Sequence, residues 1–165
     1  MNLQFYLEKL FASEKFQNFI KENPSAYFCS GFFALDKENK GNKIHIDYII
    51  PETKKVFSFQ LEKEVDVLPV EQSGENLFGS LPDNINFDFG EIEKLIEDKM
   101  KEQEIKNKVQ KILLSLQTFK GETCLVGTIF ISGLGMIKIR IDLDKKKIVE
   151  FEKKSFMDML KIVRK

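Results

Sequence analysis

Two stretches, residues 43–59 and 138–152, constrain the fold of this chain more than any other part of the sequence. In the second stretch, apolar residues occupy every other position as far as Leu143, which is the period of a strand that buries one face. A polar turn spans residues 144–147, and β-branched and aromatic residues return at 148–152. The first stretch has the same order. Both are therefore predicted to form antiparallel β-hairpins.

The length and composition indicate a globular chain with a substantial core. With 165 residues, 42% of them hydrophobic, the chain can bury roughly two-thirds of the surface that its unfolded form exposes. The sixteen phenylalanines are expected mainly to fill this core, because most lie within strand-like or helix-like runs. The 26 basic and 26 acidic residues cancel, so the chain lacks the concentrated positive field that phosphate binding requires. Nucleic acid is therefore not expected as a partner.

Cysteine usage and hydropathy favour a soluble, cytoplasmic protein. Cys29 and Cys124 make neither a disulfide framework nor a C-x-x-C motif. The N-terminal segment has no basic region and no small-residue cleavage site, so it is not typical of a signal peptide. The longest uncharged run, residues 123–137, is shorter than the roughly 20 apolar residues that cross a bilayer. We therefore expect no membrane span.

Hydrophobic periodicity and turn residues predict the remaining elements. Apolar spacings of three and four predict an amphipathic helix over residues 3–20 with a kink near Ser13, and Pro24 prevents its continuation. Residues 109–119 fit either a helix or a strand, and a strand is favoured because the segment leads into a turn at 118–122. The other predicted elements are strands at 26–35 and 123–132, a helix from Asp88 to Met100, and a helix that Ser155 caps and that continues through Val163.

The two hairpins have similar surroundings, which suggests an internal repeat. Cys29 precedes Ile44 by fifteen residues, and Cys124 precedes Ile139 by the same distance. With this offset, three strands and two turns correspond in the two halves. Chance similarity is the alternative, because alternation alone produces such matches.

Together these elements predict an α+β fold of two helix-plus-antiparallel-meander units with a C-terminal helix. The first unit spans residues 1–62 and the second spans residues 88–165. Residues 63–87 show no period and contain several Pro, Gly and Asn residues, so they are expected to form an irregular connection. The helix before each meander is the nearest cover for one face of its sheet.

Three features of the second unit occur together in a known domain. They are the acidic helix start at 88–96, the strand ending I-R-I-D at 139–142, and the return I-V-E-F at 148–151. With these features the unit resembles the PepSY domain family, although that family's turn usually contains glycine and residues 144–147 here do not. In the first half only residues 44–59 correspond. The resemblance implies a PepSY-like or cystatin-like sheet and a non-catalytic binding or inhibitory module, in a family with many exported or membrane-attached members.

The candidate polar residues lie on the two hairpins. His45, the single histidine, is flanked by isoleucines and therefore points to the opposite face, beside Asp47. A His-x-Asp pair could begin a metal or acid–base site, but the sequence supplies no obvious third ligand or nucleophile. Arg140 and Asp142 occupy the matching positions in the second hairpin. The four residues are therefore interpreted as a polar sheet face, with no catalytic or metal site predicted.

No stretch of the sequence predicts a reaction. Cys29 and Cys124 lie in apolar runs, where a free cysteine usually serves as a small hydrophobic residue. The G-L-G at 133–135 lies between two strands, whereas a phosphate-binding or dinucleotide-binding loop precedes a helix, so no cofactor is predicted. We expect a non-enzymatic binding module for a protein or peptide partner. Two alternatives stay open: a small-ligand carrier or enzyme with a Phe-lined pocket between sheet and helix, and self-assembly through an edge strand at 55–62.

Overall fold

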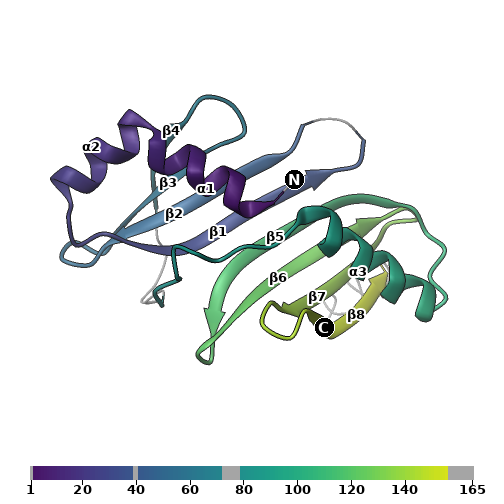
Figure 1. Cartoon of the computed structure of the whole chain (residues 1–165). Coiled ribbons are helices and arrows are strands. Elements are labelled where there is room, and N and C mark those ends of the chain that lie inside the picture. Colours follow the sequence, from purple (N-terminus) through teal and green to yellow (C-terminus); the bar gives the residue numbers. More distant parts are fainter. Residues whose placement is uncertain (1, 39–40, 72–78, 156–165) are drawn as a thin grey trace, which may run out of the picture.

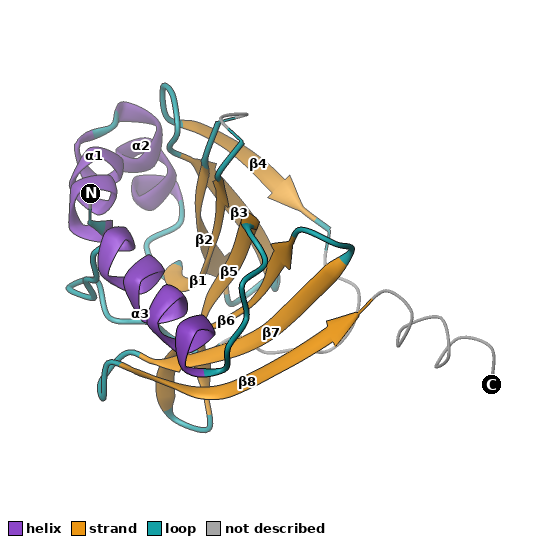
Figure 2. Ribbon diagram, turned by 90° about the vertical axis from the view of Figure 1, so that its right-hand side faces the viewer, coloured by secondary structure: helices purple, strands orange, loops and turns teal. Residues whose placement is uncertain are grey.

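The computed structural model describes residues 2–38, 41–71 and 79–155 of the chain. Eight strands form one antiparallel sheet in the order β4-β3-β2-β1-β5-β6-β7-β8, and the three described helices lie on the same side of it (Figure 1 and Figure 2). The helices are α1 (Leu3–Ala12), α2 (Glu14–Glu22) and α3 (Phe89–Glu102). The strands are β1 (Tyr27–Asp36), β2 (Lys43–Ile50), β3 (Lys55–Gln60), β4 (Asp66–Val70), β5 (Val109–Phe119), β6 (Glu122–Ile131), β7 (Gly135–Asp142) and β8 (Lys147–Ser155).

Capping side chains explain where each helix begins. Asn2 caps α1 by accepting a hydrogen bond from the Phe5 backbone N–H at 3.0 Å. Ser13 ends α1 and caps α2, so the predicted kink near this residue is a break between two helices. The Asp88 carboxylate accepts hydrogen bonds from two backbone N–H groups in the first turn of α3, which confirms the predicted N-cap.

The predicted fold class of two helix-plus-antiparallel-meander units is wrong, because the strands of both halves belong to one sheet in a mostly-sheet fold. β1 pairs with β5 over six positions, from Gly31 opposite Leu116 to Asp36 opposite Lys111. Two separate meanders would each leave an edge of unpaired backbone N–H and C=O groups at these strands. Pairing β1 with β5 satisfies both edges at once. Alternation in the sequence shows which face of a strand is buried, but it does not identify the neighbouring strand.

The segment between the halves also differs from the prediction. Residues 63–87 are predicted to be irregular, but they contain β4, which pairs with β3. Pro69 weakens the strand signal in this segment, yet an edge strand tolerates proline. Because β4 covers β3, the predicted edge strand at 55–62 is not an edge of the sheet, and self-assembly cannot use it.

Two further predictions concern single segments. Residues 109–119 form β5, which confirms the strand over the helix. Ser155, predicted to cap a C-terminal helix, is the last residue of β8, and the rest of that predicted helix lies outside the described residues.

Two ways of matching the strands of the predicted repeat disagree. The fifteen-residue offset matches Cys29 on β1 with Cys124 on β6. Counting strands from each preceding helix instead matches β1 with β5. The repeat and the division at 1–62, 63–87 and 88–165 therefore stay predictions.

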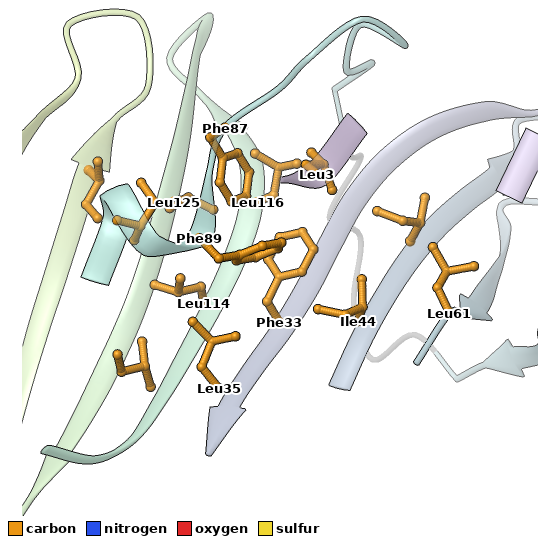
Figure 3. Packing of buried hydrophobic residues seen from close by; sticks show 14 of the residues in the cluster. Leu3, Phe33, Leu35, Ile44, Leu61, Phe87, Phe89, Leu114, Leu116 and Leu125 are labelled. Atoms are coloured by element: carbon orange, nitrogen blue, oxygen red, sulfur yellow. The ribbon is translucent and has the colours of Figure 1, made fainter. Parts of the chain in front are cut away.

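The core lies between the helices and the sheet, and phenylalanine rings fill much of it (Figure 3). Phe33 on β1 is fully buried, and its ring lies 5.7 Å from that of Phe87 and 5.2 Å from that of Phe89. Beneath α2, the rings of Phe16 and Phe59 are 5.4 Å apart. Most of these rings meet edge to face, an arrangement that stabilises aromatic cores beyond the area they bury. The expectation that phenylalanine fills the core is confirmed.

Candidate functional site

The side of the sheet opposite the helices has no described helix or strand packed over it (Figure 2). Residues directly opposite each other on neighbouring strands share a face, so the strand registers identify its side chains. We call this side the open face. It carries Phe32, His45, Asp47, Leu113, Ser115, Val126, Thr128, Lys138, Arg140, Asp142 and Glu150.

The four predicted site residues share the open face, but the structure does not bring them together. His45 and Asp47 lie on β2, whereas Arg140 and Asp142 lie on β7. Three strands separate β2 from β7, and at about 4.8 Å per strand the two pairs are roughly 19 Å apart. His45 and Arg140 nevertheless belong to one row across the sheet, connected through Phe32, Ser115 and Val126. The pairs therefore flank a common surface instead of forming one centre.

Asp47 is a shielded carboxylate on the open face. Ser30 Oγ donates a hydrogen bond to Asp47 Oδ2 at 2.9 Å, and Ser58 lies opposite Asp47 on β3. Oδ1 is shielded from solvent and has no hydrogen-bond partner within the described part of the chain. Burial raises the pKa of Asp47 above its ordinary value of 3.8, and the two serine hydroxyls and His45 offset only part of this effect. The charged form of Asp47 therefore destabilises the folded state.

Replacing Asp47 with asparagine is expected to increase the free energy of unfolding at neutral pH by about 1–3 kcal/mol, because the shape is kept and the buried charge is removed. With a raised folded-state pKa, the folded protein holds the Asp47 proton to higher pH than the unfolded chain does. The wild type therefore loses stability as the pH rises from about 3.8 through the folded-state pKa. Urea denaturation across this range should show an advantage of Asp47→Asn that grows with pH. An advantage that is equal at every pH would contradict this origin.

His45 pairs with a carboxylate that the sequence pattern did not identify. His45 Nε2 lies 3.4 Å from Glu62 Oε1, and the imidazole ring lies 5.9 Å from the ring of Phe32. Glu62 Oε2 also accepts a hydrogen bond from the Ile44 backbone N–H. Partial burial opposes ionisation of Glu62, but its hydrogen bonds and the charge of His45 together lower its pKa. The pair fastens the end of β3 to β2.

Arg140 and Asp142 have separate partners on the far side of the open face. Arg140 Nη2 donates a hydrogen bond to Glu150 Oε1 at 2.8 Å, and the guanidinium lies 4.7 Å from the centre of the Phe119 ring. Asp142 is buried, and its Oδ1 accepts a hydrogen bond from the Lys145 backbone N–H at 3.0 Å. Asp142 therefore fixes the turn between β7 and β8.

Neither cysteine is prepared for nucleophilic chemistry. Both are buried, and burial raises the pKa of Cys29 to about 12 and also raises that of Cys124. The Cys29 thiol donates a hydrogen bond to the Asp47 backbone oxygen at 3.4 Å. A thiol kept protonated is a poor nucleophile.

Between the polar pairs His45–Glu62 and Arg140–Glu150, the open face is apolar and hollowed. A hollow of about 390 Å³ is lined by half-buried Phe32, Leu113, Ser115, Val126 and Thr128, with Lys138 and Glu150 at its rim. None of these residues is among the predicted site residues. The sequence signal for such a surface is that apolar residues occupy both odd and even positions of the runs at 26–35 and 123–132, and therefore both faces of each strand. This pattern is typical of strands that are covered on two sides.

Within residues 2–38, 41–71 and 79–155, no three metal-ligating side chains come together. In the same ranges, every helix is too short or too polar to cross a bilayer.

Comparison with known proteins gives a fold but no family. No protein-family model and no curated protein matches the chain. The crystal structure of a "putative lipoprotein" from Clostridium difficile 630 superposes with a TM-score of 0.51 and 14% sequence identity, covering 86% of this chain and 91% of that one. At this identity the similarity concerns the fold alone. The PepSY resemblance of the second half therefore stays a prediction.

Proposed function

We propose that this protein is a non-catalytic module that binds a partner polypeptide on the open face of its sheet. The observation that carries the proposal is the apolar hollow formed by Phe32, Leu113 and Val126. Covering such a patch with another apolar surface removes both from water, and this burial favours binding. The polar pairs His45–Glu62 and Arg140–Glu150 flank it, as the polar rim of an interface surrounds its apolar centre.

The edges of the sheet are less suitable for binding than its face. β4 contains Pro69, which removes a backbone donor, and β8 carries five charged residues among its nine. Proline and charge are the usual devices that prevent pairing with a further strand. We therefore place the partner on the face, and the cytoplasmic location expected from the sequence stays part of this proposal.

A small-ligand site between helix and sheet is the second candidate. A hollow of about 500 Å³ beside α2 is lined by several aromatic residues together with Ala26 and Asp83. Burial raises the pKa of Tyr48 in this hollow, and the charge and hydrogen bond of Asp83 add to the effect, so the phenol stays a neutral donor. Binding of an apolar dye that Ala26→Arg abolishes and Val126→Asp leaves unchanged would favour this site.

The binding proposal is tested by selecting peptides from a random displayed library against the whole protein. Val126→Asp should weaken the selected peptides about 30-fold, since it introduces a charge at the centre of the hollow. Ser115→Arg places a bulky side chain in the same hollow and should have a similar effect. With two independent variants, the test does not depend on the correct folding of either one alone. Phe5→Asp is the matched control, because Phe5 is 50% exposed on α1 at the helix side. Isothermal titration in which only Phe5→Asp weakens binding, or a selection that enriches no peptide, would refute the proposal.

A further inference from the structure

We infer that residues 156–165, which follow the described part of the chain, pack as an amphipathic helix into a second hollow of the open face, at the end of β6 and β7. This second hollow shares no lining residue with the hollow in which we place the partner polypeptide, so the inference does not depend on the proposed function. It follows from the apolar lining of the second hollow, from an exposed leucine in it, and from the point at which β8 ends.

The second hollow has a volume of about 360 Å³ and a mainly apolar lining. Phe130 lies opposite Met136 across the β6–β7 pair. Because Phe130 follows Thr128 of the open face by two residues on β6, the Phe130–Met136 pair belongs to the open face as well. Both side chains are half-buried, and Leu134 from the turn between the two strands adds a third apolar side chain. A further apolar surface can therefore be buried here.

Leu134 is an unfavourable residue for its turn. Its side chain is 74% exposed, which is the largest exposure of any large apolar side chain in the described part of the chain. Its φ is +57°, in the left-handed region that leucine adopts at a cost and that glycine, asparagine and aspartate adopt more readily. The turn itself and the described packing therefore do not account for a leucine at this position, whereas an apolar surface that covers it would.

The point at which β8 ends selects the occupant. Ser155, the last residue of β8, pairs with Gly135, which itself lines the second hollow. Residues 156–165 therefore begin beside this hollow. Phe130 lies on β6, two strands from β8, which is about 10 Å at the usual strand spacing. A helix of ten residues is about 15 Å long, so the segment is long enough to cross the hollow.

The sequence of residues 156–165 fits such a surface. Four apolar residues stand at the i, i+3, i+4, i+7 spacing of a helical stripe: Phe156, Met159, Leu160 and Val163. A helix this short is marginal in water by itself, because nucleation is costly and few hydrogen bonds follow it. Packing the stripe into the second hollow would stabilise the helix and would remove both apolar surfaces from water.

Hydrogen exchange of the full chain, measured by mass spectrometry, tests the inference. If about nine molecules in ten hold the helix docked, the amides of residues 160–164 should exchange about tenfold more slowly than their intrinsic rate. Leu134→Asn should abolish this protection because it removes the exposed apolar side chain. Asparagine adopts a φ of +57° more readily than leucine does, so this variant should keep the sheet at least as stable. Leu160→Asn, on the stripe, should also abolish the protection.

Two matched variants control for other effects. Ile162→Asn makes a similar change away from the stripe and should keep most of the protection, so helix propensity alone is not what is measured. Val126→Asp alters the hollow of the proposed partner site and should leave the protection unchanged. Unprotected amides in the wild type, or equal protection in Leu134→Asn and the wild type, would overturn the inference. Protection that grows with protein concentration, with light scattering reporting the mass of two chains, would also overturn it, because the occupant would then be the segment of a second copy.

Discussion

Replacing Gly127 with alanine is expected to lower the free energy of unfolding by about 3 kcal/mol or more. A Cβ atom at this position would lie 2.2 Å from the Leu113 backbone oxygen and 2.8 Å from Leu114 Cδ2. The nearer atom belongs to the backbone of β5, the neighbouring strand, so no side-chain rotation can relieve the clash. The pairing of β5 with β6 would have to shift. Urea denaturation followed by circular dichroism measures the loss.

Gly121→Ala is the matched control for this prediction. Gly121 has a φ of +78°, but a Cβ atom there would meet nothing within 4 Å. Its replacement should cost only the backbone strain of about 1–2 kcal/mol. If the two variants were equally stable, the close approach of β5 to Gly127 would be contradicted.

Most strands of this fold could be predicted from the sequence, whereas their arrangement could not. The hairpins at 43–59 and 138–152 could be predicted, because a strand that buries one face has apolar residues at every second position. The pairing of β1 with β5 depends on contacts between residues about 80 positions apart, and no local pattern encodes it. β4 was missed for a local reason, since Pro69 is unfavourable in any strand except an edge.

The candidate site was predictable in part for the same reason. Because successive side chains of a strand point to alternate faces, His45 and Asp47 are predicted to lie on the face away from Ile44 and Ile46, and the structure agrees. The partners Glu62 and Glu150 were not predictable, because each depends on a turn or a register between strands. The hollow could not be predicted, because composition predicts that phenylalanines such as Phe32 fill the core, and only the sheet shows that no described element covers Phe32 and Val126.

Replacing Phe33 with alanine is expected to lower the free energy of unfolding by about 3–5 kcal/mol. Phe33 is fully buried, lies opposite Leu114 across the β1–β5 pair, and contacts the rings of Phe87 and Phe89. It therefore joins the first predicted unit, the connection and the second unit. Because these contacts cross all three segments, the variant should still unfold in one transition at a lower urea concentration.

Two probes can follow the halves separately in that experiment. All three tyrosines lie within residues 1–62, so tyrosine fluorescence reports on the first half, while hydrogen exchange of the β6 and β7 amides reports on the second. Coincident loss in Phe33→Ala is expected because one sheet and one core connect the halves. Phe5→Ala is the control, since a half-exposed ring should contribute less than about 1 kcal/mol. If the fluorescence transition moved while the β6 and β7 amides kept their protection, the halves would be independent domains, and the β1–β5 pair would be a contact between them with little energetic weight.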